Sequence, residues 1–323
     1  IHPEYFKELS QNAAIEPAAV PDIVYIPLLQ HFGAVCKPVV IIGQEVLIGT
    51  KLGEAQGGGF SAAVHSSVSG KIKAIERFYH PLAGTVDTVI IENDKKEQKD
   101  PAIKTQENPF ELSPEQIVEK IKEAGLVGMG GAGFPTHVKI TPPKKVCHID
   151  TLLINGAECE PYLTCDERLM LEKSEEIIRG IMLTKKALGV SRVFIGIENN
   201  NLQALVKIKE AMRVYQDIQL VSLPSVYPQG GEKTLIKTIL KREVPSQKLP
   251  LDTGVVVVNI ATAYAVYEAI FNNKPLYERV LTVTGQGIAH PKNLLVRIGT
   301  PIVHLIQQCG GWQGSVVKII SGG

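Results

Sequence analysis

Residues 125 to 139 read Gly-Leu-Val-Gly-Met-Gly-Gly-Ala-Gly-Phe-Pro-Thr-His-Val-Lys, and five of the first nine are glycine. Without Cβ atoms, main-chain N–H groups approach an anion closely, and positive φ costs little. We expect a helix to begin at Thr136, after Pro135. Its N-terminus adds partial positive charge and Lys139 adds a full charge. The stretch therefore predicts a cradle for a phosphate group.

The segment before this loop predicts a helix rather than a strand. Ser113 and Gln116 have the spacing of a capping box, Pro114 occupies the first helical position, and Gly125 falls where a terminating glycine belongs. Three loop glycines match the dinucleotide fingerprint G-x-G-x-x-G, but that motif requires a preceding strand. An ordinary Rossmann crossover is therefore disfavoured. The alternative without function is a flexible loop joining two helices.

Length and composition set broad limits. A chain of 323 residues with 44% hydrophobic and 21% charged residues has room for two or three domains. The net charge of +1 gives no basic field for nucleic acid. The longest uncharged apolar run, residues 253–267, is shorter than the roughly 20 residues of a membrane helix. Membrane association is therefore expected only through partners.

The cysteines indicate a reducing compartment. There are five, at positions 36, 147, 159, 165 and 309, and none forms a C-x-x-C pair. An odd number without such pairs favours reduced thiols in a cytoplasmic setting. The chain begins at Ile1 and stops after an apolar run, so we expect it to be a fragment of a longer protein.

The first part of the chain predicts a small β domain. Residues 31–76 alternate short apolar runs with glycine, a spacing typical of short strands. The sequence pattern resembles the barrel-sandwich module of biotinyl and lipoyl carriers. Those carriers present a modifiable lysine at a hairpin tip, but the stretch before Gly70 contains no lysine. We therefore favour a docking or scaffold role, with His65 a structural residue rather than a ligand. The charged run at 93–101 is typical of a connector and places the boundary near residue 100.

Residues 101–275 predict an α/β domain. Four apolar runs are suited to buried parallel strands, at residues 151–155, 192–198, 218–223 and 255–259. Helical stretches alternate with them, including 174–188, capped by Gly189, and 201–213. Ligands in such sheets bind at the carboxyl ends of the strands.

Polar residues follow three of these strand ends. Asn155 leads into residues 156–161, Leu223 into 224–233, and Asn259 into 260–262, with groups suited to a ring or a ribose. An alternative is that Glu158 and Glu160 form a general acid/base pair, as in glycoside hydrolysis.

The last part, residues 276–323, predicts a β-grasp-like unit. Strands are expected at 279–285 and 293–299, followed by a helix at 301–309 and a further strand at 316–320. We expect Trp312 to be a core or interface anchor.

Three ordered motifs, at residues 128–136, 155–161 and 227–233, resemble the flavin subunit shared by respiratory complex I and its relatives. The likeness is strongest to the RnfC family of Rnf electron-transport complexes and includes the opening Ile1-His2-Pro3. It implies a Rossmann-like flavin domain with a mainly parallel sheet, preceded by a barrel-sandwich-hybrid domain and followed by an SLBB-like β-grasp unit. Ala157 and Met129 depart from the complex I pattern, which favours the Rnf type.

The resemblance also implies site residues. Those expected to bind FMN are Gly128, Gly130, Gly131, Gly133, Lys139, Asn155, Glu158, Gly231, Asn259 and Thr262. Those expected to face NADH are Phe134, Glu160 and Glu232. No side chain is expected to act as a nucleophile, and Cys159 is a packed thiol or, alternatively, a redox-active one.

The implied function is an NAD-dependent flavoprotein oxidoreductase subunit of a ferredoxin:NAD+ oxidoreductase and translocase. FMN is needed because nicotinamide moves two electrons as hydride, whereas an iron–sulfur cluster accepts one. The family's [4Fe–4S] clusters are expected only in a missing C-terminal part, and no metal is expected in this fragment. The implied partners are other Rnf subunits at the membrane and ferredoxin-linked electron carriers, with no nucleic acid, and the implied location is peripheral, on the cytoplasmic face.

Two other functions remain open at this point. One is the flavin-dependent cobalamin reductase of diol-utilising microcompartments, which shares these modules. The other is a non-catalytic scaffold that kept the fold and lost its flavin, against which the glycines, Lys139 and Glu158 argue.

Overall fold

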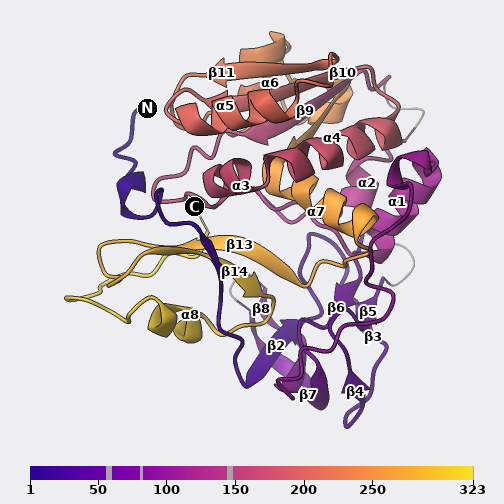
Figure 1. Cartoon of the computed structure of the whole chain (residues 1–323), viewed down its shortest axis with the longest axis vertical. Helices are drawn as coiled ribbons and strands as arrows, with labels where there is room; N and C mark the ends of the chain where they lie inside the picture. The colour runs from indigo at the N-terminus through magenta and orange to yellow at the C-terminus, as the bar shows by residue number, and fades with distance from the viewer. Residues whose placement is uncertain (56–59, 81–82, 144–147, 323) are drawn as a thin grey trace.

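The computed structural model describes residues 1–55, 60–80, 83–143 and 148–322. Figure 1 shows a parallel-sheet layer with its helices at the top, a β sandwich at the bottom, and a small sheet with one helix between them at the side. Cys147 lies outside the described residues, and the four cysteines within them are free thiols. None of the helices in the described part of the chain has both the length and the apolar character that a membrane span requires.

The lower layer consists of two packed antiparallel sheets. One has the order β2-β8-β7-β4 and the other β3-β5-β6. The strands are β2 (Ile23–Pro27), β3 (Lys37–Pro38), β4 (Glu45–Val46), β5 (Lys51–Glu54), β6 (Val64–His65), β7 (Gly70–His80) and β8 (Gly84–Asn93). Alternating side chains such as Val24 and Ile26 fill the core between the sheets. His65 is buried, and burial lowers its pKa to about 4, so the imidazole is neutral at neutral pH.

The upper layer is a four-stranded parallel sheet in the order β11-β10-β9-β12. Its strands are β9 (Thr151–Gly156), β10 (Arg192–Glu198), β11 (Ile218–Leu223) and β12 (Val255–Asn259). In chain order this is 3-2-1-4, so the strand order reverses between β9 and β12. In open α/β sheets the crevice at such a reversal is where ligands bind.

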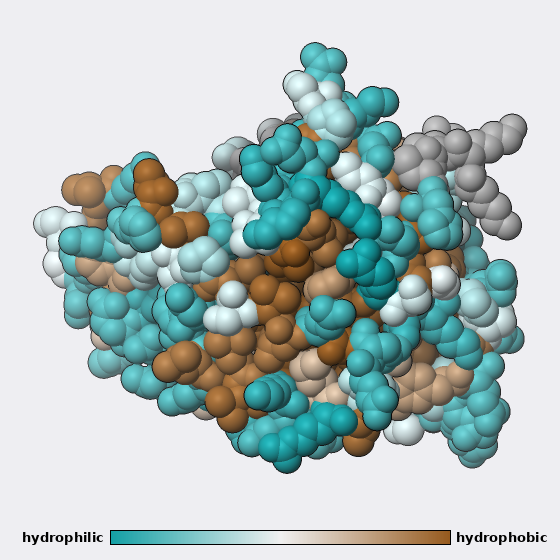
Figure 2. All heavy atoms as spheres, turned by 90° about the horizontal axis from the view of Figure 1, so that it is seen from above, coloured by the Kyte–Doolittle hydropathy of each residue, from teal (hydrophilic) through white to brown (hydrophobic). Residues whose placement is uncertain are grey.

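Helices cover both faces of this sheet. The helices are α1 (Pro114–Glu123), α2 (Thr136–Lys139), α3 (Cys165–Glu172), α4 (Ser174–Leu188), α5 (Leu202–Ala211), α6 (Glu232–Leu240) and α7 (Ile260–Phe271), with short 3-10 turns at Lys7–Leu9, Pro109–Glu111 and Pro250–Thr253. One core joins α3, α4, α5 and α7 to the sheet, and a second joins α6 to its other face. The capping box predicted at Ser113 and Gln116 is confirmed. Figure 2 shows that apolar side chains reach the surface in the middle of the upper face, framed by polar ones.

The third sheet has the order β1-β14-β13, formed by β13 (Glu278–Val283), β14 (Lys292–Arg297) and β1 (Ile15–Pro17), with α8 (Ile302–Gln308) packed on it. The strand predicted at 316–320 is wrong, because these residues have no regular secondary structure and are mostly exposed. The place of a third strand is taken by β1, which pairs parallel with β14.

The first fourteen residues form an N-terminal strap that lies apart from the β sandwich. The strap, indigo in Figure 1, runs from the parallel-sheet layer past β13 and β14 toward β2. Ile1 and Tyr227 exchange two hydrogen bonds, Phe6 stacks on Tyr162 at 4.9 Å, and Asn293 Nδ2 donates to the carbonyl of Ser10. The strap therefore joins the upper layer to the third sheet.

Candidate functional site

The glycine loop, residues 127–135 between α1 and α2, folds back on itself as a narrow hairpin. Its ends are closed by hydrogen bonds from Gly128 N to Phe134 O and from Thr136 N to Leu126 O, both 2.9 Å. The helix predicted after Pro135 is α2, which ends at Lys139. The tip of the loop is exposed at residues 130–132.

Consecutive amides at this tip are open. The N–H groups of residues 130 to 134 form no hydrogen bond of good length and angle with the residues that the structure describes, although residues 129–132 form a turn. A run of unpaired amides at an exposed turn is a ready site for an anion, because a bound ligand can supply the missing acceptors.

All three layers hold the loop in place. Met129 N donates to Thr262 Oγ1 of α7 at 3.0 Å, and Arg279 Nη2 of β13 donates to Met129 O at 3.1 Å. From the β sandwich, Phe32 N donates to Gly133 O at 3.0 Å. The tip is thus fixed by contacts that do not use the open amides.

Two glycines of the loop meet different surroundings. A Cβ at Gly130 would lie 2.6 Å from Nδ2 of Asn259, closer than real Cβ contacts come. A Cβ at Gly131 would meet nothing within 4 Å. The absence of a side chain at Gly130 follows from packing, whereas the space beside Gly131 is free for a ligand.

The switch point of the sheet brings two predicted residues together. Asn155, one residue before the end of β9, lies beside Asn259, its register partner at the end of β12. Asn155 donates to Gly230 O at 2.8 Å and accepts from Ala157 N at 3.1 Å. Asn259 accepts from Ala261 N at 2.8 Å, capping α7, and donates to Asp166 Oδ2 at 2.7 Å. Both amide side chains are therefore used within the protein.

Glu158 is enclosed more completely. Its side chain is 3% exposed, and its backbone φ is +48°. The carboxylate accepts from the α3 amides of Asp166 at 2.7 Å and Glu167 at 3.1 Å. Lys7 Nζ lies 3.6 Å from Oε2 and donates to the main-chain carbonyls of Glu158 and Leu163 at 2.7 Å. Glu158 thus stabilises the N-terminus of α3 and anchors the strap.

A buried acidic group lies next to it. Burial and the neighbouring charge of Glu158 raise the pKa of Asp166 to about 7. Ligand atoms of Glu158, Cys165 and Asp166 lie within 4.8 Å of one another. Burial raises the pKa of the Cys165 thiol well above its usual value, and the oxygens of Glu158 already accept two amides. The chemistry of the group therefore favours helix capping over metal binding.

The predicted charged residues at the mouth of the site pair among themselves. Lys139 Nζ lies 2.6 Å from Glu232 Oε1, and both side chains are partly exposed. Gly231 is the N-cap residue of α6, directly before Glu232. Glu160 lies beside Tyr227, and its charge raises the pKa of that phenol. The carboxylate of Glu158 accepts hydrogen bonds from the α3 amides, so it is not available to act with Glu160 as a general acid/base pair.

Phe134 stands at the end of the loop with aromatic neighbours. Its ring centroid is 6.2 Å from that of Phe32 and 5.2 Å from that of Phe60, both in the β sandwich. Cys159 is buried and accepts a hydrogen bond from Gly230 N at 3.2 Å, which agrees with a packed thiol.

Four further residues at or near the site were missed by the sequence interpretation: Lys7, Asp166, Glu198 and Arg279. Glu198, at the end of β10, is fully buried, and neither carboxylate oxygen has a partner among the described residues. Burial raises its pKa to about 7. A carboxylate directly after the apolar run 193–197 was the signal that could have identified it. Lys7 and Arg279 lie far from the motifs in the sequence, and no local pattern marked them as residues of the site.

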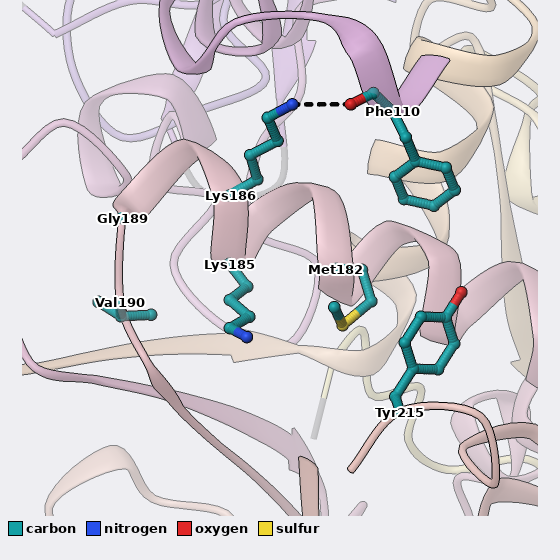
Figure 3. Close-up of a pocket in the computed structure, with 7 residues that line it drawn as sticks. All are labelled: Phe110, Met182, Lys185, Lys186, Gly189, Val190 and Tyr215. Carbon is teal, nitrogen blue, oxygen red and sulfur yellow. Dashed lines mark hydrogen bonds between the residues drawn. The ribbon is translucent and has the colours of Figure 1, made fainter. Parts of the chain in front are cut away.

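A separate pocket of about 360 Å³ lies at the C-terminal end of α4 (Figure 3). Gly189 and Val190 in its wall lead into β10, so it is at the amino ends of the strands, away from the glycine loop. Lys185 pairs with Asp217, and Lys186 donates to the carbonyl of Phe110. Both ammonium groups are occupied, and we assign this pocket no function.

A parallel sheet with a switch point, a glycine loop with open amides, and two flanking β units define a protein of the complex I flavin-subunit class. Family models agree: residues 121–268 match the Nuo51 FMN-binding domain, 1–96 the RnfC barrel sandwich hybrid domain, and 280–317 the SLBB domain. Within this class, the chain belongs to the RnfC family, the C subunits of ion-translocating oxidoreductase complexes. The predicted family and fold class are thereby confirmed.

Individual relatives support this assignment. The chain is 45% identical over its whole length to the C subunit of the proton-translocating ferredoxin:NAD(+) oxidoreductase complex of Clostridium ljungdahlii, and spans 70% of that protein. It is 42% identical to the C subunit of the Na(+)-translocating complex of Acetobacterium woodii, spanning 72% of it. The names of these relatives do not favour a cobalamin reductase.

Among solved structures, an NAD+-reducing [NiFe]-hydrogenase in its air-oxidized state has a similar fold. The match has a TM-score of 0.54 with 22% identity, and covers 63% of this chain and 40% of the hydrogenase chain. At this identity the likeness concerns the fold alone.

Proposed function

We propose that this chain binds FMN on the glycine loop and passes electrons between NAD(H) and that flavin within an ion-translocating ferredoxin:NAD+ oxidoreductase complex. The observation that carries the proposal is the run of open amides from residue 130 to residue 134, located at the switch point of a parallel sheet. The match of residues 121–268 to an FMN-binding domain supports it. So do the relatives named as subunits of such complexes.

The residues present fit a flavin phosphate. Open amides of Gly130, Gly131 and Gly133 would donate to phosphate oxygens, and the space beside Gly131 admits the ligand. Lys139 would add positive charge, shared with Glu232. Gly128, Asn155, Glu158, Gly231, Asn259 and Thr262 complete the proposed flavin site, in which Glu158 acts through α3 and the strap rather than as a ligand, and Thr262 holds the loop.

The chemistry that FMN supplies when bound is acceptance of two electrons as hydride and release of single electrons. The protein's part is to place the nicotinamide against the ring and to exclude competing reactions. We assign Phe134, Glu160 and Glu232 to the nucleotide side, where Glu160 and Glu232 are near the surface. No side chain needs to form a covalent bond.

We further propose three units, 1–100, 101–275 and 276–323, in which the middle one carries the flavin and the others fix its loop. From the first unit, the strap and β1 extend to contact the other two. As a subunit of a membrane-associated complex, the chain would act peripherally at the cytoplasmic face. The free thiols of the described cysteines support a reducing compartment.

The test is an FMN titration of the purified chain, followed by anaerobic addition of NADH. We expect one FMN bound per chain and loss of flavin absorbance when NADH is added. Lys139→Ala should weaken FMN binding about tenfold by removing a charge near the phosphate. Glu158→Gln should act mainly through stability. Failure of the wild type to bind FMN would refute the flavin assignment and favour the non-catalytic scaffold.

A further inference from the structure

Two phenylalanines of the β sandwich are exposed beside the glycine loop. Phe32 is 59% exposed and Phe60 is 49% exposed. Phe32 is roughly parallel to Phe134, with 29° between the ring planes, whereas Phe60 meets Phe134 edge to face at 62°. The three rings form one aromatic cluster that crosses from the sandwich to the loop. Leaving large apolar rings in water is unfavourable, so a cluster of them at a site indicates a binding surface.

The main chain fixes this cluster. Phe32 N donates to Gly133 O at 3.0 Å, which ties the first ring to the tip of the loop. Gly33 has φ of +135°, and a Cβ there would lie 2.0 Å from Phe60 O. Ala34 N donates to the same carbonyl at 2.8 Å. The two segments that carry the rings are therefore held against each other and against the loop.

The cluster adjoins the loop on which FMN is proposed to bind, so a dinucleotide lying against that flavin has the rings within its reach. Aromatic side chains favour planar ring ligands, which stack on them at about 1–3 kcal/mol per nucleobase. A nicotinamide dinucleotide has two planar bases joined by a pyrophosphate. Its nicotinamide must reach the flavin, which leaves the adenine for a second surface nearby.

We propose that Phe32 and Phe60, together with Phe134, form the surface on which the adenine ring of the dinucleotide stacks. This inference rests on the proposed function. It gives the β sandwich a direct part in nucleotide binding, beyond docking or scaffolding. The two rings come from residues outside the match to the FMN-binding domain.

The experiment compares two reductants on the FMN-loaded chain. NADH carries the adenylate, whereas reduced nicotinamide mononucleotide has only the reactive half. Dissociation constants come from the concentration dependence of flavin reduction in anaerobic stopped flow. For the double variant Phe32→Leu/Phe60→Leu we expect the value for NADH to rise about tenfold, while that for the mononucleotide stays unchanged.

A matched control is Phe78→Leu. Phe78 is 42% exposed in the same β sandwich but stacks on Tyr25 and not on the glycine loop. It should leave both dissociation constants at their wild-type values. Thermal unfolding of each variant confirms that leucine, which keeps most of the apolar volume, leaves the fold intact.

Three results would overturn the inference. An equal rise in the dissociation constants of NADH and the mononucleotide would mean that the rings contact the nicotinamide or only maintain the shape of the loop. Weaker FMN binding would place them against the flavin, and unchanged constants would remove them from the site. A wild-type chain that binds no FMN would instead refute the proposed function, and this inference with it, so the two failures are distinguishable.

Discussion

The glycine loop and the sheet edge beneath it carry most of the predicted flavin residues, yet they differ in how their polar groups are used. At the loop tip, the amides of residues 130–134 are open. At the sheet edge, the side chains of Asn155, Glu158 and Asn259 already have protein partners. Under the proposed function, this difference assigns FMN binding mainly to the main chain of the loop, and assigns to these side chains the task of holding the main chain in place.

Replacing Glu158 should give the largest effect. Glu158→Ala removes the acceptor for two α3 amides and leaves Lys7 buried without its carboxylate. We expect the free energy of unfolding to fall by about 3 kcal/mol. Chemical denaturation at neutral pH measures it, with Glu160→Ala as the control that changes little. Normal stability combined with lost FMN affinity would make Glu158 a ligand and remove the contrast between the two regions.

Adjacent glycines of the loop should respond differently to alanine. Gly130→Ala forces a methyl group against Asn259, so stability should fall by about 1–3 kcal/mol. Gly131→Ala meets open space, so stability should stay within about 0.5 kcal/mol. The new methyl group would occupy the ligand's space and weaken FMN binding about tenfold. Wild-type FMN affinity in Gly131→Ala would show that the ligand does not approach this part of the loop.

Glu198 makes the sheet edge sensitive to pH. The pKa of Glu198 is raised from its ordinary value of 4.5 to about 7 in the folded chain. Between these two pH values, Glu198 is therefore protonated more in the folded chain than in the unfolded chain. Stability from this group is therefore lost as pH rises from about 4.5 to 7. Glu198→Gln should reduce that loss by roughly 1–3 kcal/mol, measured as the difference from wild type in unfolding at several pH values.

The comparison with wild type is needed because other groups in the chain titrate in the same pH range. Asp166, with its pKa also about 7, contributes in the same direction. His65 has a lowered pKa of about 4, so its contribution has the opposite sign and is lost as pH falls below about 6.5. Identical pH profiles for wild type and Glu198→Gln would mean that water or another group satisfies this carboxylate equally in both states.

Much of the fold could be predicted because its signals are local. Apolar runs gave the four parallel strands, and capping residues such as Ser113 gave the bounds of α1. The third sheet could not be predicted in full, because β1 pairs with β14 from the other end of the chain. Sequence near 316–320 favoured a strand, but no partner strand lies beside it in the described structure.

The site divides in the same way. Local glycine content located the loop, and strand ends located Asn155 and Asn259. What the sequence could not give is which polar groups satisfy one another. Glu158 was expected to face the flavin, whereas its contacts run to α3 and to Lys7 in the strap. Pairings between distant segments depend on packing, which no local pattern records.

The smallest of the expected effects concerns the link between the two regions. Thr262 Oγ1 is the acceptor for Met129 N, so it joins α7 at the sheet edge to the base of the open tip. Thr262→Val keeps the shape of the side chain and removes that acceptor. Stability should fall by about 1 kcal/mol, the usual contribution of one hydrogen bond. FMN affinity should fall about fivefold, because the Met129 amide is left unpaired and the tip loses its fixed position.

Thr262→Ser is the matched control, since it keeps the hydroxyl and should retain wild-type FMN affinity. Both variants are measured by the same FMN titration and by chemical denaturation. If Thr262→Val lowers stability but binds FMN as tightly as Thr262→Ser, the loop keeps its shape without this bond. Its position would then depend on the contacts from Arg279 and Phe32, and the sheet edge would have less influence on the site than its location suggests.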